Sequence, residues 1–388
     1  MKIAGIIAEY NPFHNGHARH IALTREKTGC DYVIVCMDGH FTQRGEPALW
    51  SKWARARMAL SCGADAVFEL PAAFAVRTAD AFARGGVAIL GALGADWLAF
   101  GCETEDPGLL RALANLRREE PPRVSEGIRA GLERGLSHAR AWGEAAGEML
   151  GISPELINRP NLILGSEYVR AIDELDPQMR PVVILREGDY HDGTLGRMAS
   201  ATAIRTAILR GDMDGATGAI PAAARPFATP DALHAMDDML LMRLRGMSID
   251  EMAALPDMGE GLEHRLYRLC RATATREALL EALKCKRYTR ARLSRVLTHA
   301  MLGVTQAELE ARPLPGYARL LGARRGTEDL LRELSRRSRI PIAASAKELR
   351  GNPVFDLECR ATDCWALLHD APTLRLPGRE FTEKFVRI

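Results

Sequence analysis

Short apolar segments alternate with longer helix-forming segments through the first half of the chain. The apolar segments are bounded by Gly, Asp or Pro, which is typical of buried strands. The predicted strands span residues 3–8, 32–37, 66–70, 97–100 and 182–185. The helices predicted between them span residues 17–28, 51–62, 78–93, 107–118 and 125–149. This alternation predicts an α/β fold with a doubly wound, Rossmann-like parallel sheet, whose ligand binds beyond the carboxyl ends of the strands.

The pattern changes after Arg210. Residues 211–230 are rich in Gly, Ala and Pro, and residues 231–302 follow almost wholly helical patterns. We therefore expect a domain boundary near residue 212, with a nucleotide-binding domain over residues 1–212 and a mainly helical second domain over residues 213–388. Helical patterns continue to about Ser338, and short apolar segments after it indicate a small mixed end.

Composition narrows the class of protein. The 388 residues are 47% hydrophobic, enough for two ordinary cores, and the net charge of +2 confines any basic surface to a local patch. The eight cysteines include no CxxC pair, which argues against a zinc ribbon or a thioredoxin-type site. No segment approaches 18 uninterrupted apolar residues, and the N-terminus lacks a signal-peptide pattern. We therefore expect a cytoplasmic protein with no membrane or DNA partner.

Two histidines follow the first predicted strand directly. His14 and His17 flank Asn15 and Gly16 where the next helix begins. Backbone N–H groups and the helix dipole favour phosphate at such a position, and Gly16 allows close approach of a ligand. Two imidazoles at this spacing can contact adjacent phosphate oxygens and stabilise charge that develops on them.

This loop has two other interpretations. With His20, the two histidines form an evenly spaced set that suggests a metal site, but no HExxH pattern or companion carboxylate accompanies them. A solvated turn is the other alternative for any isolated HxxH. The preceding buried strand and the following helix favour phosphate binding by His14 and His17. His20 lies one helical turn further in, so we expect it to pack against the protein or to support the pair without touching the phosphate.

The segment HNGH at residues 14–17 resembles the HxGH signature of the nucleotidyltransferase superfamily, which includes class I aminoacyl-tRNA synthetases and coenzyme adenylyltransferases. In that superfamily the histidines hold the triphosphate of ATP during attack on the α-phosphorus. The resemblance also implies a Ser/Thr-rich turn with a basic residue, and ASATAIR supplies Ser200, Thr202 and Arg205. The hydroxyls would bond the β- and γ-phosphates while Arg205 neutralises departing pyrophosphate. Helix capping is the alternative role for the hydroxyls.

Six longer sequence segments make the resemblance more specific. They are GIIAEYNPFHNGH, GHFTQRGEPALWSKWARARMALSCGADAVFELP, FGCETED, RPNLILGSEYVRAI, REGDYHD and KRYTRARLSRVLTHAML. Together these segments resemble the bacterial tRNA(Met) cytidine acetate ligase family. The resemblance implies activation of acetate with ATP as acetyl-adenylate, then acetylation of N4 of the wobble cytidine, position 34, of elongator tRNA(Met). Magnesium is expected with the triphosphate.

The same resemblance implies the residues of the site. His14, His17, Ser200, Thr202 and Arg205 would be catalytic. The implied ATP-binding residues are Ile7, Ala8, Glu9, Tyr10, Asn11, Pro12, Phe13, His14, Asn15, Gly16, His17, Ala18, Arg19, His20, Gly101, Asn161 and Arg186.

A basic segment in the second domain is a candidate RNA contact. The candidate residues are Lys284, Lys286, Arg287, Tyr288, Arg290 and Arg292. Cationic side chains would neutralise RNA phosphates and Tyr288 could stack on a base, whereas the alternative is an ordinary solvated helix face. In the polar loop Gln43–Gly45, Arg44 is a further candidate to approach the tRNA or the acetate; the alternative is a solvated loop.

Two rival functions remain from the sequence. One is an adenylyltransferase for a small coenzyme precursor, against which the long second domain argues. The other is a catalytically silent nucleotide- or RNA-binding module, against which the intact His14, His17, Ser200 and Thr202 argue.

Overall fold

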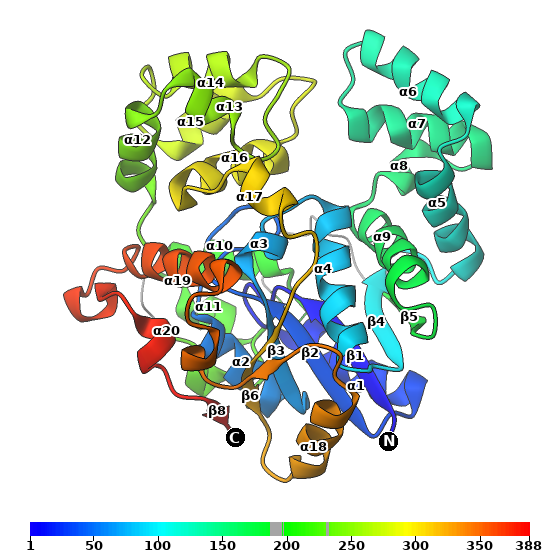
Figure 1. Cartoon of the computed structure of the whole chain (residues 1–388), viewed down its shortest axis with the longest axis vertical. Helices are drawn as coiled ribbons and strands as arrows, with labels where there is room; N and C mark the ends of the chain where they lie inside the picture. Colours follow the sequence, from blue (N-terminus) through cyan, green and yellow to red (C-terminus); the bar gives the residue numbers. More distant parts are fainter. Residues whose placement is uncertain (187–195, 197, 230–232) are drawn as a thin grey trace.

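Five parallel strands form the centre of a single sheet. The computed structural model describes residues 1–186, 196, 198–229 and 233–388. The parallel strands are β1 (Ile3–Ala8), β2 (Tyr32–Asp38), β3 (Ala66–Leu70), β4 (Trp97–Cys102) and β5 (Arg180–Leu185). Their order is β5-β4-β1-β2-β3, so the winding reverses between β1 and β4 (Figure 1). Ligands of open parallel sheets bind at this reversal, beyond the carboxyl ends of the strands.

All five predicted strands are confirmed, with bounds that differ by a few residues at most. Strands β1, β2 and β3 are buried on both faces, which explains their near-continuous apolar character, whereas β5 at the edge of the sheet is only partly buried. Ile34 and Cys36 pack in one core with the helices of residues 79–92 and 160–175, whereas Val33 and Val35 pack in a second core with the helices of residues 15–28 and 52–61. The first-half helices are α1 (Asn15–Thr28), α2 (Lys52–Ser61), α3 (Ala72–Ala75), α4 (Ala79–Ala92), α5 (Pro107–Glu119), α6 (Pro122–Glu133), α7 (His138–Leu150), α8 (Pro154–Ile157) and α9 (Pro160–Leu175).

The single helix predicted over residues 125–149 is wrong. It is a hairpin of α6 and α7, because Gly135 between them adopts a φ of 82° that ends the first helix. Gly127 and Gly131 let the two helices pack closely, since a Cβ at Gly131 would lie 2.6 Å from the Cβ of Ala141. Helices α5 to α8 form one lobe beside the sheet, called here the hairpin lobe (Figure 1).

The chain beyond residue 200 is mostly helical. Its helices are α10 (Ala201–Leu209), α11 (Met213–Thr217), η1 (Arg225–Phe227), α12 (Asp237–Gly246), α13 (Ile249–Ala253), α14 (Leu262–Leu269), α15 (Arg276–Leu283), α16 (Arg290–Leu302), α17 (Gln306–Glu310), α18 (Glu328–Arg337), η2 (Ala346–Leu349), α19 (Pro353–Ala366), η3 (Pro372–Arg375) and α20 (Arg379–Thr382). Helices α12 to α17 form a second lobe, called here the helical lobe (Figure 1).

The chain returns to the sheet after the helical lobe. Strand β6 (Ala318–Ala323) pairs antiparallel with β3, and β7 (Ile342–Ala343) and β8 (Val386–Arg387) pair parallel with β6. Strand β6 interrupts the helical pattern expected to about Ser338. The sheet thus contains strands from both sides of residue 212. The domain boundary expected at that residue stays a prediction.

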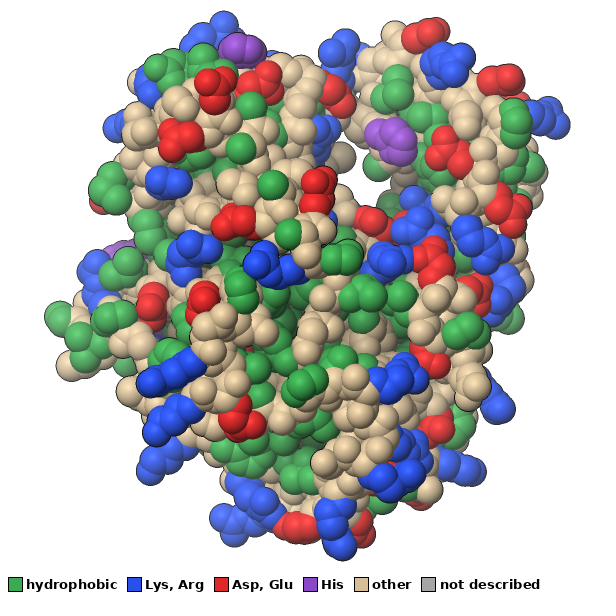
Figure 2. Space-filling model, in the orientation of Figure 1, with side chains coloured by type: hydrophobic (Ala, Val, Ile, Leu, Met, Phe, Trp, Pro, Cys, Tyr) green, Lys and Arg blue, Asp and Glu red, His purple; other side chains and the backbone are tan. Residues whose placement is uncertain are grey.

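A hollow separates the two lobes on the face shown in Figure 2. A cavity of about 470 Å³ lies there, lined by Gly135 of the hairpin lobe and by Glu260, Gly261, Arg265 and residues 285–288 of the helical lobe. Within the described part of the chain, no helix combines the length and the apolarity needed to cross a membrane.

Candidate functional site

His14 caps the N-terminus of α1, directly after β1. Its Nδ1 atom accepts a hydrogen bond from the Gly16 N–H at 3.0 Å, and the Nδ1 atom of His17 accepts one from the His14 N–H at 3.3 Å. The two rings are stacked, with centroids 3.8 Å apart. A ring nitrogen that accepts an N–H bond carries no proton, so each neutral ring carries its proton on Nε2. The pair therefore presents two neighbouring Nε2–H donors.

Burial keeps both rings uncharged. The pKa of His14 is lowered to about 4, by burial first and by the nearby charge of Arg186 second. The pKa of His17 lies well below its usual value, because burial is reinforced by His14 and Arg186. At neutral pH the pair therefore acts as hydrogen-bond donors, and positive charge for a triphosphate has to come from arginines.

The first backbone N–H groups of α1 are already engaged. The Asn15 N–H donates to the carbonyl of Ala219 at 2.8 Å, and the His17 N–H donates to the carbonyl of His14 at 2.9 Å. The Gly16 N–H donates to the His14 ring. Contrary to the expectation from the sequence, these groups are not available to a phosphate in this structure. The imidazole donors and the helix dipole remain available.

Two buried aromatic rings hold the histidine pair in place. Tyr10 meets the His17 ring edge to face at 4.8 Å and lies 4.8 Å from the Phe13 ring. Tyr10 is 1% exposed and Phe13 is fully buried. A Cβ at Gly16 would lie 2.8 Å from Cε1 of His14, so a larger residue there would displace the capping ring. The geometry of the cap thus requires a glycine at position 16 and uses the ring of His17.

Helix α10 brings the ASATAIR segment to the histidine loop. Arg205 donates to the carbonyl of Asn11 at 3.3 Å and forms an ion pair with Glu46 at 3.0 Å. Ser200 caps α10, with its Oγ accepting the Ala203 N–H at 3.2 Å. Thr202 is exposed in the first turn. The segment therefore supplies one cation in contact with the loop and two hydroxyls at a helix N-terminus.

Gly101, Asn161 and Arg186 come together at the ends of β4 and β5. Asn161 accepts a hydrogen bond from Arg186 Nη1 at 3.3 Å, and a Cβ at Gly101 would lie 3.2 Å from Cγ of Arg186. Glu103, which the sequence did not single out, accepts the Asn161 side-chain amide at 2.8 Å. Its bond fixes which end of the Asn161 amide faces Arg186. Its place directly after β4 is the only sequence signal that could have indicated it.

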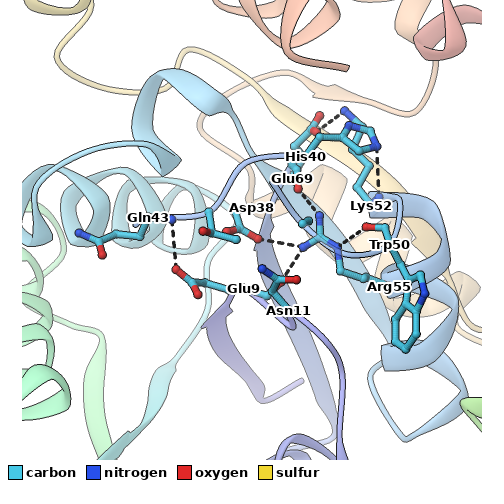
Figure 3. Close-up of polar contacts among 12 residues, drawn as sticks. Glu9, Asn11, Asp38, His40, Gln43, Trp50, Lys52, Arg55 and Glu69 are labelled. Carbon is cyan, nitrogen blue, oxygen red and sulfur yellow. Dashed lines mark hydrogen bonds and ion pairs between the residues drawn. The ribbon is translucent and has the colours of Figure 1, made fainter. Parts of the chain in front are cut away.

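Arg55 ties the ends of β1 and β2 together (Figure 3). Its guanidinium donates to the carbonyl of Glu9 at 2.5 Å, to the carboxylate of Asp38 at 2.9 Å and to the carbonyl of Trp50 at 3.1 Å, and it also bonds the carbonyl of Gly39. Burial raises the pKa of Asp38 well above its usual range, although Arg55 opposes the shift. Burial also raises the pKa of Glu9. Both carboxyls therefore border the site with a weakened tendency to ionise.

A buried lysine lies at the centre of a second polar cluster (Figure 3). The Nζ atom of Lys52 contacts Glu69, Glu380 and, at 3.1 Å, Glu358. In the described residues, His40 with Glu358 and Glu380 is the one group of side chains at metal-ligand spacing. The ammonium of Lys52 already contacts both carboxylates of that group. This group therefore does not fit a resident magnesium ion.

The predicted RNA-binding residues lie at the start of α16 and before it. Lys286 and Arg287 are exposed and line the cavity between the lobes. Tyr288 is 6% exposed, and its hydroxyl donates to the carbonyl of Glu260 at 3.1 Å. Stacking of Tyr288 on a base stays a prediction, and in this structure most of its ring is covered by protein.

The remaining cations of this segment have protein partners. Arg290 pairs with Glu277 at 2.5 Å and with Glu281 at 3.0 Å, while Lys284 lies 3.5 Å from Glu281. Arg292 donates to the carbonyl of Asp257 at 2.9 Å. Lys286 and Arg287 are consequently the better placed candidates for phosphate contact.

Comparison with known proteins points to one family. A family model described as HIGH Nucleotidyl Transferase matches residues 1–376. The tRNA(Met) cytidine acetate ligase of Geobacillus sp. (strain WCH70) is 35% identical over 386 residues, covering 96% of each chain. The chain belongs to the tRNA(Met) cytidine acetate ligase family of HIGH nucleotidyl transferases. The tRNA(Met) cytidine acetate ligase of Bacillus subtilis (strain 168) is also 35% identical, over 392 residues that cover 96% of this chain and 94% of the relative.

Solved structures in the family have the same fold. The crystal structure of apo Thermotoga maritima TmcAL matches over the whole of both chains, with a TM-score of 0.93 and 30% identity. TmcAL bound with alpha-thio ATP matches with a TM-score of 0.91, again over the whole of both chains. The family and the fold expected from the sequence are thereby confirmed. Of the REGDYHD segment, residues 187–192 lie outside the described residues.

Proposed function

We propose that this protein is an ATP-dependent ligase that activates acetate as acetyl-adenylate and transfers the acetyl group to N4 of the wobble cytidine, position 34, of elongator tRNA(Met). The observation that carries the proposal is the pair of neutral Nε2–H donors of His14 and His17 at the reversal of the sheet, with Arg205 and Arg186 nearby. Family relatives named tRNA(Met) cytidine acetate ligase and the ATP-analogue complex of TmcAL support it.

The first step makes the adenylate. A carboxylate oxygen of acetate attacks the α-phosphorus of ATP, an oxygen–phosphorus bond forms, and the bond to the β-phosphate breaks to release pyrophosphate. His14 and His17 would donate hydrogen bonds to oxygens that gain charge in this displacement. Ser200, Thr202 and Arg205 would hold the departing pyrophosphate. Gly101, Asn161 and Arg186, with the loop of residues 7–20, would bind the rest of the nucleotide.

The second step transfers the acetyl group. The exocyclic N4 amine of cytidine attacks the acetyl carbon, the bond to the AMP oxygen breaks, and N4 loses a proton. The protein need not supply a covalent nucleophile, because holding the two substrates in contact provides much of the acceleration. Magnesium would accompany the triphosphate as its counter-ion.

Binding of tRNA would use the helical lobe. Lys286 and Arg287 would neutralise backbone phosphates, and the wobble base must leave its stack for its amine to reach an acyl-adenylate. We place this reaction in the cytoplasm.

Labelled acetate tests the proposal. The protein is incubated with ATP, magnesium and radiolabelled acetate, with and without tRNA(Met), and the tRNA is digested to nucleosides. We expect label in N4-acetylcytidine only when tRNA is present. ATP binding without any label in tRNA would overturn the proposal, and adenylation of a small coenzyme precursor in parallel reactions would favour the rival enzyme class.

A further inference from the structure

The loop after β2 is docked directly onto the helical lobe. The carbonyl oxygen of Gly45 accepts hydrogen bonds from Ser294 Oγ at 3.0 Å, Thr298 Oγ1 at 2.7 Å and Arg276 Nη2 at 3.1 Å. Ser294 and Thr298 are buried. Three donors on one buried carbonyl oxygen hold this point of the loop against α16 and the start of α15.

Only glycine fits at this contact. Gly45 has a φ of 69°, in the left-handed region that other residues rarely adopt. A Cβ on Gly45 would lie 2.7 Å from the backbone nitrogen of Arg295 and 2.8 Å from its Cα. The loop backbone therefore lies as close to the backbone of α16 as sterics allow.

The residues on either side of Gly45 connect the loop to the edge of the nucleotide site. The Gln43 N–H donates to the Glu9 carboxylate at 3.1 Å, at the end of β1 (Figure 3). Glu46 pairs with Arg205 at 3.0 Å, and Arg205 reaches the carbonyl of Asn11. One loop thus connects α16 with both sides of the segment that leads to the histidine pair.

Helix α16 also begins in the predicted RNA contact. Arg290, Ser294 and Thr298 are spaced by four residues, so they share one face of the helix. The N-terminal end of α16 follows Lys286 and Arg287 in the chain. It belongs to the same rigid helix as Ser294 and Thr298, which bond Gly45. Within the proposed reaction, tRNA and acetyl-adenylate would bind to different parts of the chain, and transfer requires a fixed distance between them.

We propose that Gly45 is a positioning residue whose contact with Ser294, Thr298 and Arg276 sets the placement of the tRNA-binding helix relative to the adenylate site. The proposal rests on the function proposed above. The contact touches neither substrate, so it acts on acetyl transfer and not on adenylate formation or on tRNA affinity.

The test removes the two hydroxyl donors of α16, leaves Arg276 in place and changes the shape of the interface little. In a Ser294→Ala, Thr298→Val double variant, we expect the kcat of tRNA acetylation to fall about tenfold or more, because small misplacements of reacting groups cost large factors in rate. The KM for tRNA and the acetate-dependent exchange of pyrophosphate into ATP should stay within about twofold of the wild type. Thr298→Ser keeps a hydroxyl at the same place and should retain the wild-type kcat.

A glycine pair provides a matched control. Gly45→Ala and Gly303→Ala carry similar backbone strain, since φ is 69° at Gly45 and 64° at Gly303, but a Cβ at Gly303 meets no atom closer than 3.8 Å. Gly303→Ala, at the other end of α16, should therefore leave transfer intact while Gly45→Ala reduces it. If Gly45→Ala fails to fold, the donor variants decide alone.

The outcomes separate the two proposals. A parallel fall of pyrophosphate exchange and transfer, a rise in KM for tRNA alone, or unchanged transfer in the double variant would each overturn the positioning role. Absence of tRNA acetylation by the wild-type protein would instead overturn the proposed function. Protection of residues 42–47 from hydrogen exchange on addition of tRNA gives a readout independent of activity, expected in the wild type and diminished in the double variant.

Discussion

Arg205 donates a hydrogen bond to the carbonyl oxygen of Asn11 at 3.3 Å, which joins two segments 194 positions apart in the chain. The same guanidinium pairs with Glu46 at 3.0 Å. Arg205 is thereby held at the loop that carries the histidine pair, and its charge is available there even though both imidazoles are neutral.

Arg205→Lys should impair adenylate formation. A lysine keeps the charge but lacks the planar fork that contacts Asn11 and Glu46 together. We expect acetate-dependent pyrophosphate exchange to fall on the order of 100-fold, the usual effect of losing one donor that stabilises transition-state charge. Arg210→Lys, at the exposed end of α10, is the matched control and should retain wild-type exchange. Wild-type exchange by Arg205→Lys would contradict the assignment.

His14 has a structural and a chemical role that one substitution can separate. His14→Asn retains a side-chain oxygen able to cap α1, and Asn is among the preferred capping residues, so stability should change by less than about 1 kcal/mol. The Nε2–H donor is removed, and pyrophosphate exchange should fall on the order of 100-fold. His20→Asn, one turn further along α1, should keep exchange within about tenfold. Urea unfolding and exchange assays on the same preparations distinguish removal of the donor from loss of the fold.

The strand pattern could be predicted because its cause is local. Strands buried on both faces are near-continuous apolar segments, as β1 and β2 are, and the histidine loop follows the first of them in sequence. Strand β6, with the sequence ARLLGA, is also buried throughout, but it contains Arg319, its partner β3 is remote in the chain and nothing near β6 indicates the pairing. Gly135 could not be recognised as a helix end, because a glycine within a periodic segment can also lie inside a helix.

The contacts of the site were less predictable than its motifs. Lys52 meets Glu358 across 306 positions, and a lysine in the first turn of a helix is ordinarily solvated. Tyr288 is surrounded by basic residues in sequence, which is typical of an RNA-stacking residue, yet its packing against Glu260 is decided by the tertiary fold. Gly45 is similarly inconspicuous in sequence, since three donors from two distant helices create its role.

A buried histidine should make stability sensitive to acid. Burial lowers the pKa of His299 to about 4, below the ordinary value of 6.5, so the unfolded chain takes up a proton between those values and the folded protein does not. The contribution of neutral, buried His299 to the free energy of unfolding is complete above pH 6.5 and is lost as the pH falls toward 4. Raised carboxyl pKa values, as at Glu69, act in the opposite sense, so the comparison needs a variant.

His299→Leu isolates this contribution. The difference in unfolding free energy between wild type and His299→Leu should shift in favour of the variant as the pH falls from 6.5 toward 4, as measured by urea unfolding across that range. His264→Gln alters a histidine whose side chain is 70% exposed and should leave the pH dependence unchanged. A constant difference between wild type and His299→Leu would show that His299 titrates normally in the folded protein.

Lys52 should be essential for stability. Burial alone would lower its pKa, but Glu358, Glu380 and Glu69 together raise it above the usual value, so the ammonium stays charged. Lys52→Met would leave three buried carboxyls without their cation, and we expect a loss of about 3–5 kcal/mol in unfolding free energy.

Lys27→Met is the control for this loss. The pair of Lys27 with Glu105 has side chains that are 39% and 50% exposed, and such pairs contribute at most about 1 kcal/mol. Equal losses in urea unfolding of the two variants would mean that the buried cluster has no special role.

Lys286 and Arg287 should account for a measurable share of tRNA affinity. Removing one phosphate contact lowers the slope of log Kd against log salt concentration by roughly 0.7 to 0.9. A Lys286→Ala, Arg287→Ala double variant should therefore reduce this slope by about 1.5. Its tRNA binding should be weakened most at low salt. Fluorescence anisotropy with labelled tRNA over a salt series measures both effects. Tyr288→Phe should bind normally, because its hydroxyl donates to the carbonyl of Glu260 and its ring is buried. An unchanged slope in the double variant would place the RNA contact elsewhere on the molecule, while weakened binding by Tyr288→Phe would show that this segment rearranges on the RNA.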